Sequence, residues 1–148
     1  MKKNLIVTLM GPTGVGKTDL IIELYSQIPI TIISVDSIQI YKDLNIGSGK
    51  PSSEVLKKYP HELIDFVEPT ESYSTARFQE DVIHCIKDSF EANKTPVLVG
   101  GTMMYFHHLI NGISKLPSVS NQIRIEVQSE FDEKGSEEMH KYLQKIDR

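Results

Sequence analysis

The residues with the clearest chemical potential form a glycine loop near the start of the chain. The loop is Gly11-Pro12-Thr13-Gly14-Val15-Gly16-Lys17-Thr18, and it fits the phosphate-binding pattern G-x-x-x-x-G-K-[ST] at every position. Glycines let backbone N–H groups turn inward around an anion, and Lys17 adds a positive charge that can reach a terminal phosphate. The Thr18 hydroxyl suits a bound Mg²⁺. The loop therefore predicts an oligophosphate ligand with magnesium, ATP included, without saying which oligophosphate.

A carboxylate, Asp36, follows directly after the apolar run Ile30–Val35. In open α/β sheets, ligands bind along the edge where the strands end. At that edge a carboxylate can hold Mg²⁺ or accept a proton from a substrate. A residue that caps a turn or a helix would explain the same position, so both interpretations stay open.

A third candidate is Gly100-Gly101-Thr102, which follows the apolar run Val97–Val99. The two glycines allow a ligand to approach the backbone closely. Thr102 offers a hydroxyl at the start of a predicted helix. An ordinary helix N-cap explains Thr102 as well as a binding role does.

Alternating apolar runs and amphipathic segments position these groups. The expected strands are residues 5–10, 30–35, 62–66 and 96–99, and the expected helices are residues 17–27, 53–58, 75–92 and 102–110. Serines at 52 or 53 and at 74 are expected to cap two of the helices. Strands alternating with helices predict an α/β fold, a P-loop NTPase-like three-layer domain with a mostly parallel sheet.

The pattern changes near Pro117, after which no strand is expected. We predict a catalytic core over residues 1–114 and the start of a helical extension over residues 115–148, broken at Gly135-Ser136. The chain stops at Arg148 directly after an amphipathic pattern. That abrupt stop favours truncation over a natural domain end.

Composition limits the class of protein. The chain has 148 residues, a net charge of −4 and a single cysteine, Cys85, so it has neither an internal disulfide framework nor a cysteine-built zinc site. The longest apolar runs fall far short of the roughly 18–20 residues that cross a bilayer. We expect a cytoplasmic monomer without a membrane partner. The net charge gives no overall basic field for nucleic acid.

Six motifs, in this order, resemble those of bacterial tRNA dimethylallyltransferases, also called tRNA isopentenyltransferases. The motifs are Gly11–Thr18, Ser34–Tyr41, Asn45–Pro51, Pro60–Asp65, Tyr73-Ser74 with Phe78, and Val97–Tyr105. The resemblance runs through essentially the whole chain, but members of this family continue well beyond its last residue.

The resemblance implies a specific ligand and reaction. The P-loop would hold the diphosphate of dimethylallyl diphosphate, and the dimethylallyl group would move to N6 of the adenosine just 3′ of the anticodon in the anticodon stem-loop of tRNA. Diphosphate is then the leaving group. Lys17, the loop amides and Mg²⁺ on Thr18 would stabilise its growing charge.

The resemblance also implies roles for residues outside the P-loop. Asp36 would be the general base that takes the proton from N6, and Ser37, Ile38 and Gln39 would help to hold the flipped-out adenine. Thr102 would line the reaction channel and contact the leaving group or the tRNA. Arg124 matches a family arginine near the anticodon loop.

Two other interpretations stay open at this point. A small-molecule P-loop kinase shares the first strand and loop, although a kinase needs lid arginines and Arg77 is the only arginine between residues 36 and 123. The third interpretation is a truncated fragment with weak or no activity that keeps the diphosphate-binding loop. We expect weak or no turnover from residues 1–148 alone.

Overall fold

The computed structural model describes residues 4–113 and 119–147. The chain divides into two compact units, Met1–Ile113 and Ser114–Arg148, which are described separately below. The boundary expected at 114/115 and the change of character expected near Pro117 lie outside the described residues.

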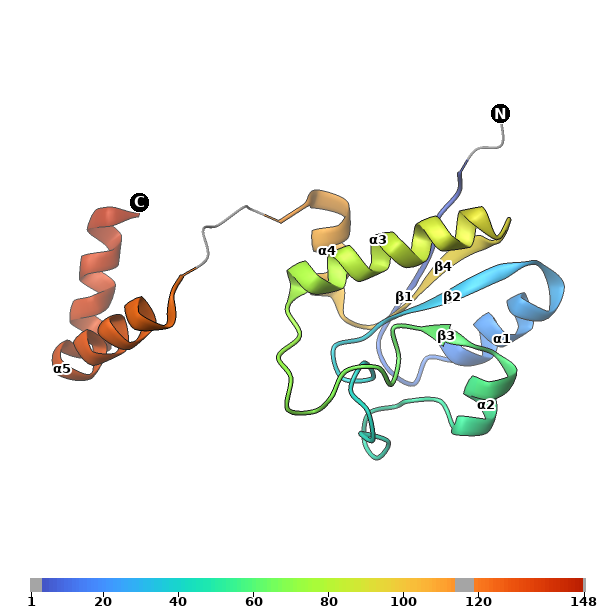
Figure 1. Cartoon of the computed structure of the whole chain (residues 1–148), viewed down its shortest axis with the longest axis horizontal. Helices are drawn as coiled ribbons and strands as arrows, with labels where there is room; N and C mark the ends of the chain where they lie inside the picture. Colours follow the sequence, from blue (N-terminus) through green and yellow to red (C-terminus); the bar gives the residue numbers. More distant parts are fainter. Residues whose placement is uncertain (1–3, 114–118, 148) are drawn as a thin grey trace. The chain divides into compact units, whose positions relative to one another are not determined.

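The first unit contains one parallel sheet (Figure 1). Its strands are β1 (Val7–Met10), β2 (Ile30–Val35), β3 (His61–Glu62) and β4 (Thr95–Gly100), in the order β1-β4-β2-β3. Every strand pair is parallel, and β4 pairs with β1 on one side and β2 on the other. The sheet confirms the α/β fold class, and within it the first and last expected strands pair with each other.

Among the described residues, four helices belong to this unit and one belongs to the second. They are α1 (Lys17–Gln27), α2 (Ser53–Lys58), α3 (Thr75–Glu91), α4 (Met103–Asn111) and α5 (Asn121–Ile146). Serine caps start two of the helices of the first unit. The Ser52 hydroxyl accepts from Val55 N at 3.3 Å, and the Ser74 hydroxyl accepts from Arg77 N at 3.2 Å. Both caps were expected from the sequence, because serine is favoured at helix N-termini.

The strand β2 divides its side chains between the two faces of the sheet. Ile30 and Ile32 pack with Ile21 of α1, whereas Ile33 and Val35 pack in a cluster with side chains of α3 and α4. This period of two produces the three layers, with α1 and α3 on opposite faces of the sheet (Figure 1). The carboxyl ends of β1, β2 and β4 therefore meet at one edge.

The third strand is shorter than the sequence predicts. An extended strand over residues 62–66 is wrong, because β3 ends at Glu62. Leu63 and Asp65 have φ of 59° and 56°, in the left-handed region, which ends the strand. The chain then pairs again, through Asp65 N to Gln39 O at 3.0 Å and Phe66 N to Ile40 O at 2.9 Å.

Gly100 is the last residue of β4 and has no room for a side chain. An added Cβ would overlap the backbone carbonyl of Val35 on the neighbouring strand β2. Because backbone atoms cannot move aside cheaply, the two strands approach this closely only with glycine at that position.

Replacing this glycine should therefore be costly. We expect Gly100→Ala to lower the free energy of unfolding by about 3 kcal/mol or more, through overpacking against backbone. The matched control is Gly11→Ala, whose added Cβ would meet Val15 Cγ2 at an ordinary 3.4 Å. Chemical denaturation of both variants checks the prediction. Equal stabilities of Gly100→Ala and Gly11→Ala would show that β4 and β2 are farther apart at Gly100 than the structure has them.

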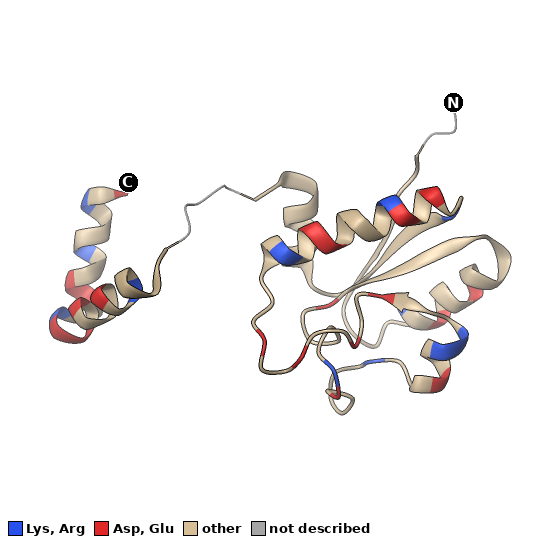
Figure 2. Cartoon of the chain, viewed as in Figure 1, with Lys and Arg blue, Asp and Glu red and all other residues tan. Residues whose placement is uncertain are grey.

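The second unit consists of α5, which begins after the Ser120 cap and bends at Gly135. Gly135 has φ 76° and ψ 168°, so the helix break expected at Gly135-Ser136 is confirmed. Acidic and basic residues are interspersed along both α3 and α5 (Figure 2). No helix among the described residues is long and apolar enough to cross a membrane.

Candidate functional site

The glycine loop connects β1 to α1, as the sequence predicts. Gly14 and Gly16 have φ of 86° and 84°, a left-handed backbone conformation that residues other than glycine rarely adopt. The Lys17 ammonium donates to the carbonyl oxygens of Gly11 at 2.7 Å and Pro12 at 2.6 Å. An ammonium carries three protons, so the third can bind an anion held at the start of α1.

The Asp36 carboxylate caps the turn that follows β2. Its Oδ1 accepts from Ile38 N at 2.9 Å and from Gln39 N at 3.1 Å. The capping interpretation is therefore correct for one oxygen. Among the described residues, the second oxygen, Oδ2, has no hydrogen-bond partner, which leaves it available as a base or a metal ligand.

Thr102 precedes α4, but its hydroxyl does not cap that helix. Thr102 Oγ1 instead accepts from Ser37 N at 3.0 Å and donates to Ser37 Oγ at 3.4 Å. This contact ties the residue after the β4 glycines to the residue after Asp36. The predicted group Asp36, Ser37 and Thr102 is thus brought together across the edge of the sheet.

A cavity of about 380 Å³ opens at this edge. Its lining includes the expected residues Thr13, Gly14, Gly16, Lys17, Thr18, Asp36, Gln39, Gly100 and Gly101. Other expected residues lie beside it in the chain but not in its lining, namely Gly11, Pro12, Val15, Ser37, Ile38 and Thr102. Arg124 lies in the first turn of α5, in the second unit. The P-loop and the candidate base therefore share one space.

The loop after Asp36 forms a further wall of this cavity. Gln39 Nε2 donates to Ser48 O at 3.3 Å, which folds the loop back on itself. Gly49 has φ 66°, and an added Cβ there would touch Thr13 Cγ2 of the P-loop at 3.4 Å. Gly49 and Pro51 of this loop both line the cavity.

The buried ammonium of Lys50 holds the loop in this position. The Lys50 side chain is only 2% exposed and pairs with Asp65. It also donates to Tyr41 O at 2.7 Å, nine residues earlier in the chain. A lysine this buried must be paired, and here its partners close the loop.

Sequence reasoning missed three polar cavity residues as binding candidates, Asp19, Ser34 and His61. Ser34 sits inside an apolar strand, and a polar residue in such a run is a signal that could have identified it. His61 Nδ1 lies 2.6 Å from Tyr59 O. Because a carbonyl only accepts, Nδ1 carries the proton, and burial lowers the pKa of this imidazole below 6.5, a shift that the bond to Tyr59 partly opposes.

The lowered pKa of His61 predicts how stability depends on pH. Between the lowered pKa and the ordinary value of 6.5, the unfolded chain binds a proton that the folded chain does not. Stability should therefore fall as the pH drops below about 6.5, and the contribution of His61 should be constant at higher pH.

Denaturation of wild type and His61→Asn at several pH values between about 5 and 7.5 measures this contribution. We expect the free energy of unfolding of the variant to depend less on pH. The difference from wild type should be about 1.4 kcal/mol for each unit by which the pKa of His61 differs between the folded and unfolded chains. His107→Asn, at an exposed position, is the control. Parallel pH curves for wild type and His61→Asn would contradict the assignment.

Oxygen atoms dominate the polar side chains of the cavity, which fits Mg²⁺. Thr18, Ser34, Asp19 and Asp36 all line it. Mg²⁺ usually keeps several waters and is held by one or two protein oxygens together with substrate phosphates. In the described part of the chain, no three His, Cys, Asp or Glu side chains could hold a metal ion by themselves.

The geometry separates two kinds of chemistry within one space. The P-loop end offers backbone amides, an ammonium and a hydroxyl, which suit a leaving phosphate or diphosphate. The Asp36 end offers a free carboxylate oxygen, which suits removal of a proton from a nucleophile. Transfer of a group from a phosphate ester to a protonated nucleophile needs both.

Comparisons with known proteins agree on one family. A family model described as IPP transferase matches residues 39–148. The tRNA dimethylallyltransferase of Psychrobacter sp. (strain PRwf-1) is 46% identical over 144 residues, which is 97% of this chain and 40% of that protein. This chain thus spans less than half the length of that curated relative.

Solved structures give the same result. The full-length tRNA isopentenylpyrophosphate transferase of Bacillus halodurans matches with a TM-score of 0.72 and 34% identity, over 98% of this chain and 48% of that one. A eukaryotic dimethylallyltransferase acting on tRNA matches with a TM-score of 0.71 and 30% identity, over 79% of this chain and 30% of that one. Since the family model covers well over half of its residues, the chain belongs to the IPP transferase family.

Proposed function

We propose that this chain carries the catalytic core of a tRNA dimethylallyltransferase. The observation that carries the proposal is the single cavity that holds both the P-loop and Asp36. The named activities of the relatives, which act on tRNA, supply the substrates. We further propose that the chain acts as a cytoplasmic monomer, which sedimentation of the purified chain tests for the oligomeric state.

In the proposed reaction, N6 of the adenosine attacks the first carbon of dimethylallyl diphosphate. The new N–C bond forms as the C–O bond breaks, and diphosphate leaves with the electron pair. Lys17 and the amides of the P-loop stabilise the charge that develops on the leaving oxygen. Mg²⁺, when bound, neutralises further charge on the diphosphate.

Asp36 completes the proton balance of the reaction. Its Oδ1 is held by two backbone amides, so Oδ2 can take the proton that N6 loses. Ser37 and Thr102 fix the backbone beside this carboxylate through the hydrogen bond from Ser37 N. Gln39 lines the cavity, and with Ser37 and Ile38 it would hold the flipped-out adenine. Arg124 would contact the anticodon loop.

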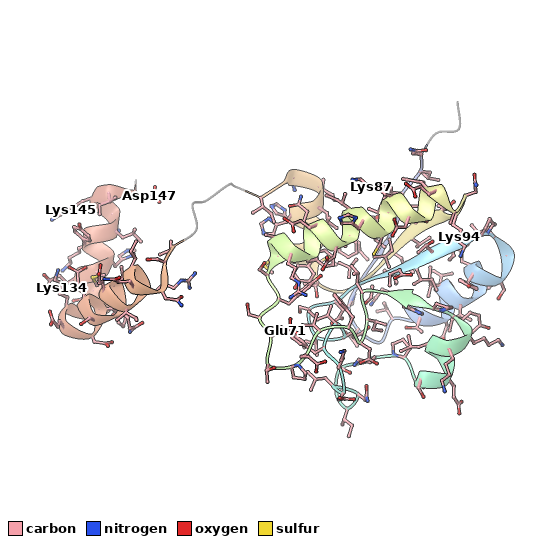
Figure 3. The ribbon with its side chains drawn as sticks, in the orientation of Figure 1. Glu71, Lys87, Lys94, Lys134, Lys145 and Asp147 are labelled. Atoms are coloured by element: carbon pink, nitrogen blue, oxygen red, sulfur yellow. The ribbon has the colours of Figure 1, made fainter. Side chains whose placement is uncertain are left out.

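Two observations disfavour a kinase. In P-loop NTPases an aspartate helps to hold Mg²⁺, whereas β4, the strand beside β1, ends at Gly100 and is followed by Gly101. Arg77, the candidate lid arginine, lies on α3 and pairs with Glu71 at 3.4 Å, a residue labelled in Figure 3. Both observations count against phosphoryl transfer from ATP.

A single-turnover assay tests this function. Labelled dimethylallyl diphosphate and an anticodon stem-loop RNA are mixed with excess protein, and transfer to RNA is measured. The assay uses residues 1–148 and also a chimera in which these residues replace the matching part of the Psychrobacter relative. We expect transfer by the chimera, and none when guanosine replaces the adenosine 3′ of the anticodon. A folded chimera without transfer, beside an active relative, would refute the proposal.

A further inference from the structure

Ser34 is a nearly buried serine in the lining of the cavity. Its residue is 3% exposed, and it interrupts an otherwise apolar stretch of β2. The other buried serine, Ser89, donates to Lys94 O at 3.3 Å. Ser34 makes no side-chain hydrogen bond to any described residue. This hydroxyl is therefore free to bind water or a ligand from outside the protein.

The cavity is where that water or ligand would bind. Ser34 belongs to the cavity lining, and no fully covered polar side-chain atom of the described residues lacks a partner, so the Ser34 hydroxyl is open to the cavity. Ile30 and Ile32, two and four residues earlier, pack against Ile21 of α1. By the alternation of a strand, Ser34 points to the same face, toward the helix that begins with Lys17 and Thr18.

The neighbouring strand supplies no oxygen ligand at this level. Ser34 is in register with Val99 of β4, and the next residue, Gly100, cannot carry a side chain. β2 lies on the other side of β4 from the P-loop strand β1, and at this level it provides the hydroxyl of Ser34.

We propose that Ser34 helps to bind the hydrated Mg²⁺ ion of a magnesium diphosphate held in the P-loop. The Thr18 hydroxyl on α1 would bind Mg²⁺, and the Ser34 hydroxyl on the sheet would contact a metal-bound water, because Mg²⁺ retains part of its water shell. This inference rests on the proposed function, since it requires a diphosphate in the P-loop.

Calorimetric titration of the purified chain with inorganic diphosphate tests the assignment, once with excess Mg²⁺ and once with EDTA. We expect Ser34→Ala to weaken binding roughly fivefold with Mg²⁺, as loss of one neutral hydrogen bond does, and to leave binding in EDTA unchanged. The melting temperature of Ser34→Ala should equal or exceed that of wild type, because the variant removes an unpaired polar group.

Ser89→Ala is the matched control, since it removes a buried serine outside the cavity. We expect this variant to melt at a lower temperature than wild type and to bind diphosphate normally. Thr18→Val should also lose magnesium-dependent affinity, and its effect should not add to that of Ser34→Ala if both hydroxyls act on one cation.

The possible results distinguish a failure of the Ser34 assignment from a failure of the proposed function. Unchanged affinity of Ser34→Ala with Mg²⁺ would overturn the Ser34 assignment and leave the diphosphate site intact. An equal loss with Mg²⁺ and with EDTA would place the hydroxyl on the diphosphate and overturn its role toward the cation. If wild type binds no diphosphate under either condition, the proposed function and this inference both fail.

Discussion

Asp36→Asn should lower the rate of prenyl transfer by about 10²- to 10⁴-fold, the usual cost of losing a general base. The asparagine oxygen can still accept from Ile38 N and Gln39 N, so the turn after β2 should remain folded. Only the basicity of the free oxygen is lost. Single-turnover rates of the Psychrobacter chimera, with and without the substitution, measure the effect.

The affinity for dimethylallyl diphosphate decides between the two roles of Asp36. Binding should be nearly unchanged if the carboxylate touches only the adenine, and it should fall if the carboxylate holds Mg²⁺. Asp43→Asn, an exposed aspartate in the following loop, serves as the control. Near-normal turnover of Asp36→Asn would leave Asp36 as a turn cap alone.

Lys17→Met should weaken the binding of diphosphate by roughly 10- to 150-fold, because a charge-assisted hydrogen bond contributes about 1.5–3 kcal/mol. Methionine keeps the length of the side chain and removes its charge. Lys42→Met is the matched control, since Lys42 pairs with Glu68 outside the cavity. Calorimetry of both variants, after their folding is checked, measures the difference.

Equal diphosphate affinity of wild type and Lys17→Met would contradict the assignment of this lysine. Its ammonium would then serve only the carbonyls of Gly11 and Pro12. In that case the variant should lose stability without losing affinity, so a denaturation curve separates the two explanations.

The parts of the fold that depend on neighbouring residues could be predicted from the sequence. The P-loop, the strand β2, the Ser52 and Ser74 caps and the break at Gly135 each follow from residue type and short spacing. The end of the third strand could not, because Leu63 and Asp65 adopt left-handed φ and Asp65 then pairs with Gln39, a residue distant in the chain.

The candidate site depends on the order of strands, which no local pattern gives. Placing β4 between β1 and β2 brings Gly100 against Val35 and opens the space that Ser34 and the P-loop share. His61 joins that space because β3 pairs with β2. For Asp36, the sequence offered a cap or a base as alternatives, whereas the structure uses one oxygen as a cap and leaves the other free.

The proposed function requires this cavity to bind the diphosphate of dimethylallyl diphosphate in preference to a nucleoside triphosphate. Competition calorimetry on the purified chain tests it most directly, with dimethylallyl diphosphate and ATP each titrated against bound inorganic diphosphate in the presence of Mg²⁺. We predict that dimethylallyl diphosphate displaces the diphosphate at lower concentration than ATP, and that Lys17→Met weakens its binding. Tighter binding of ATP, or binding of dimethylallyl diphosphate that does not compete with diphosphate, would contradict the proposed function.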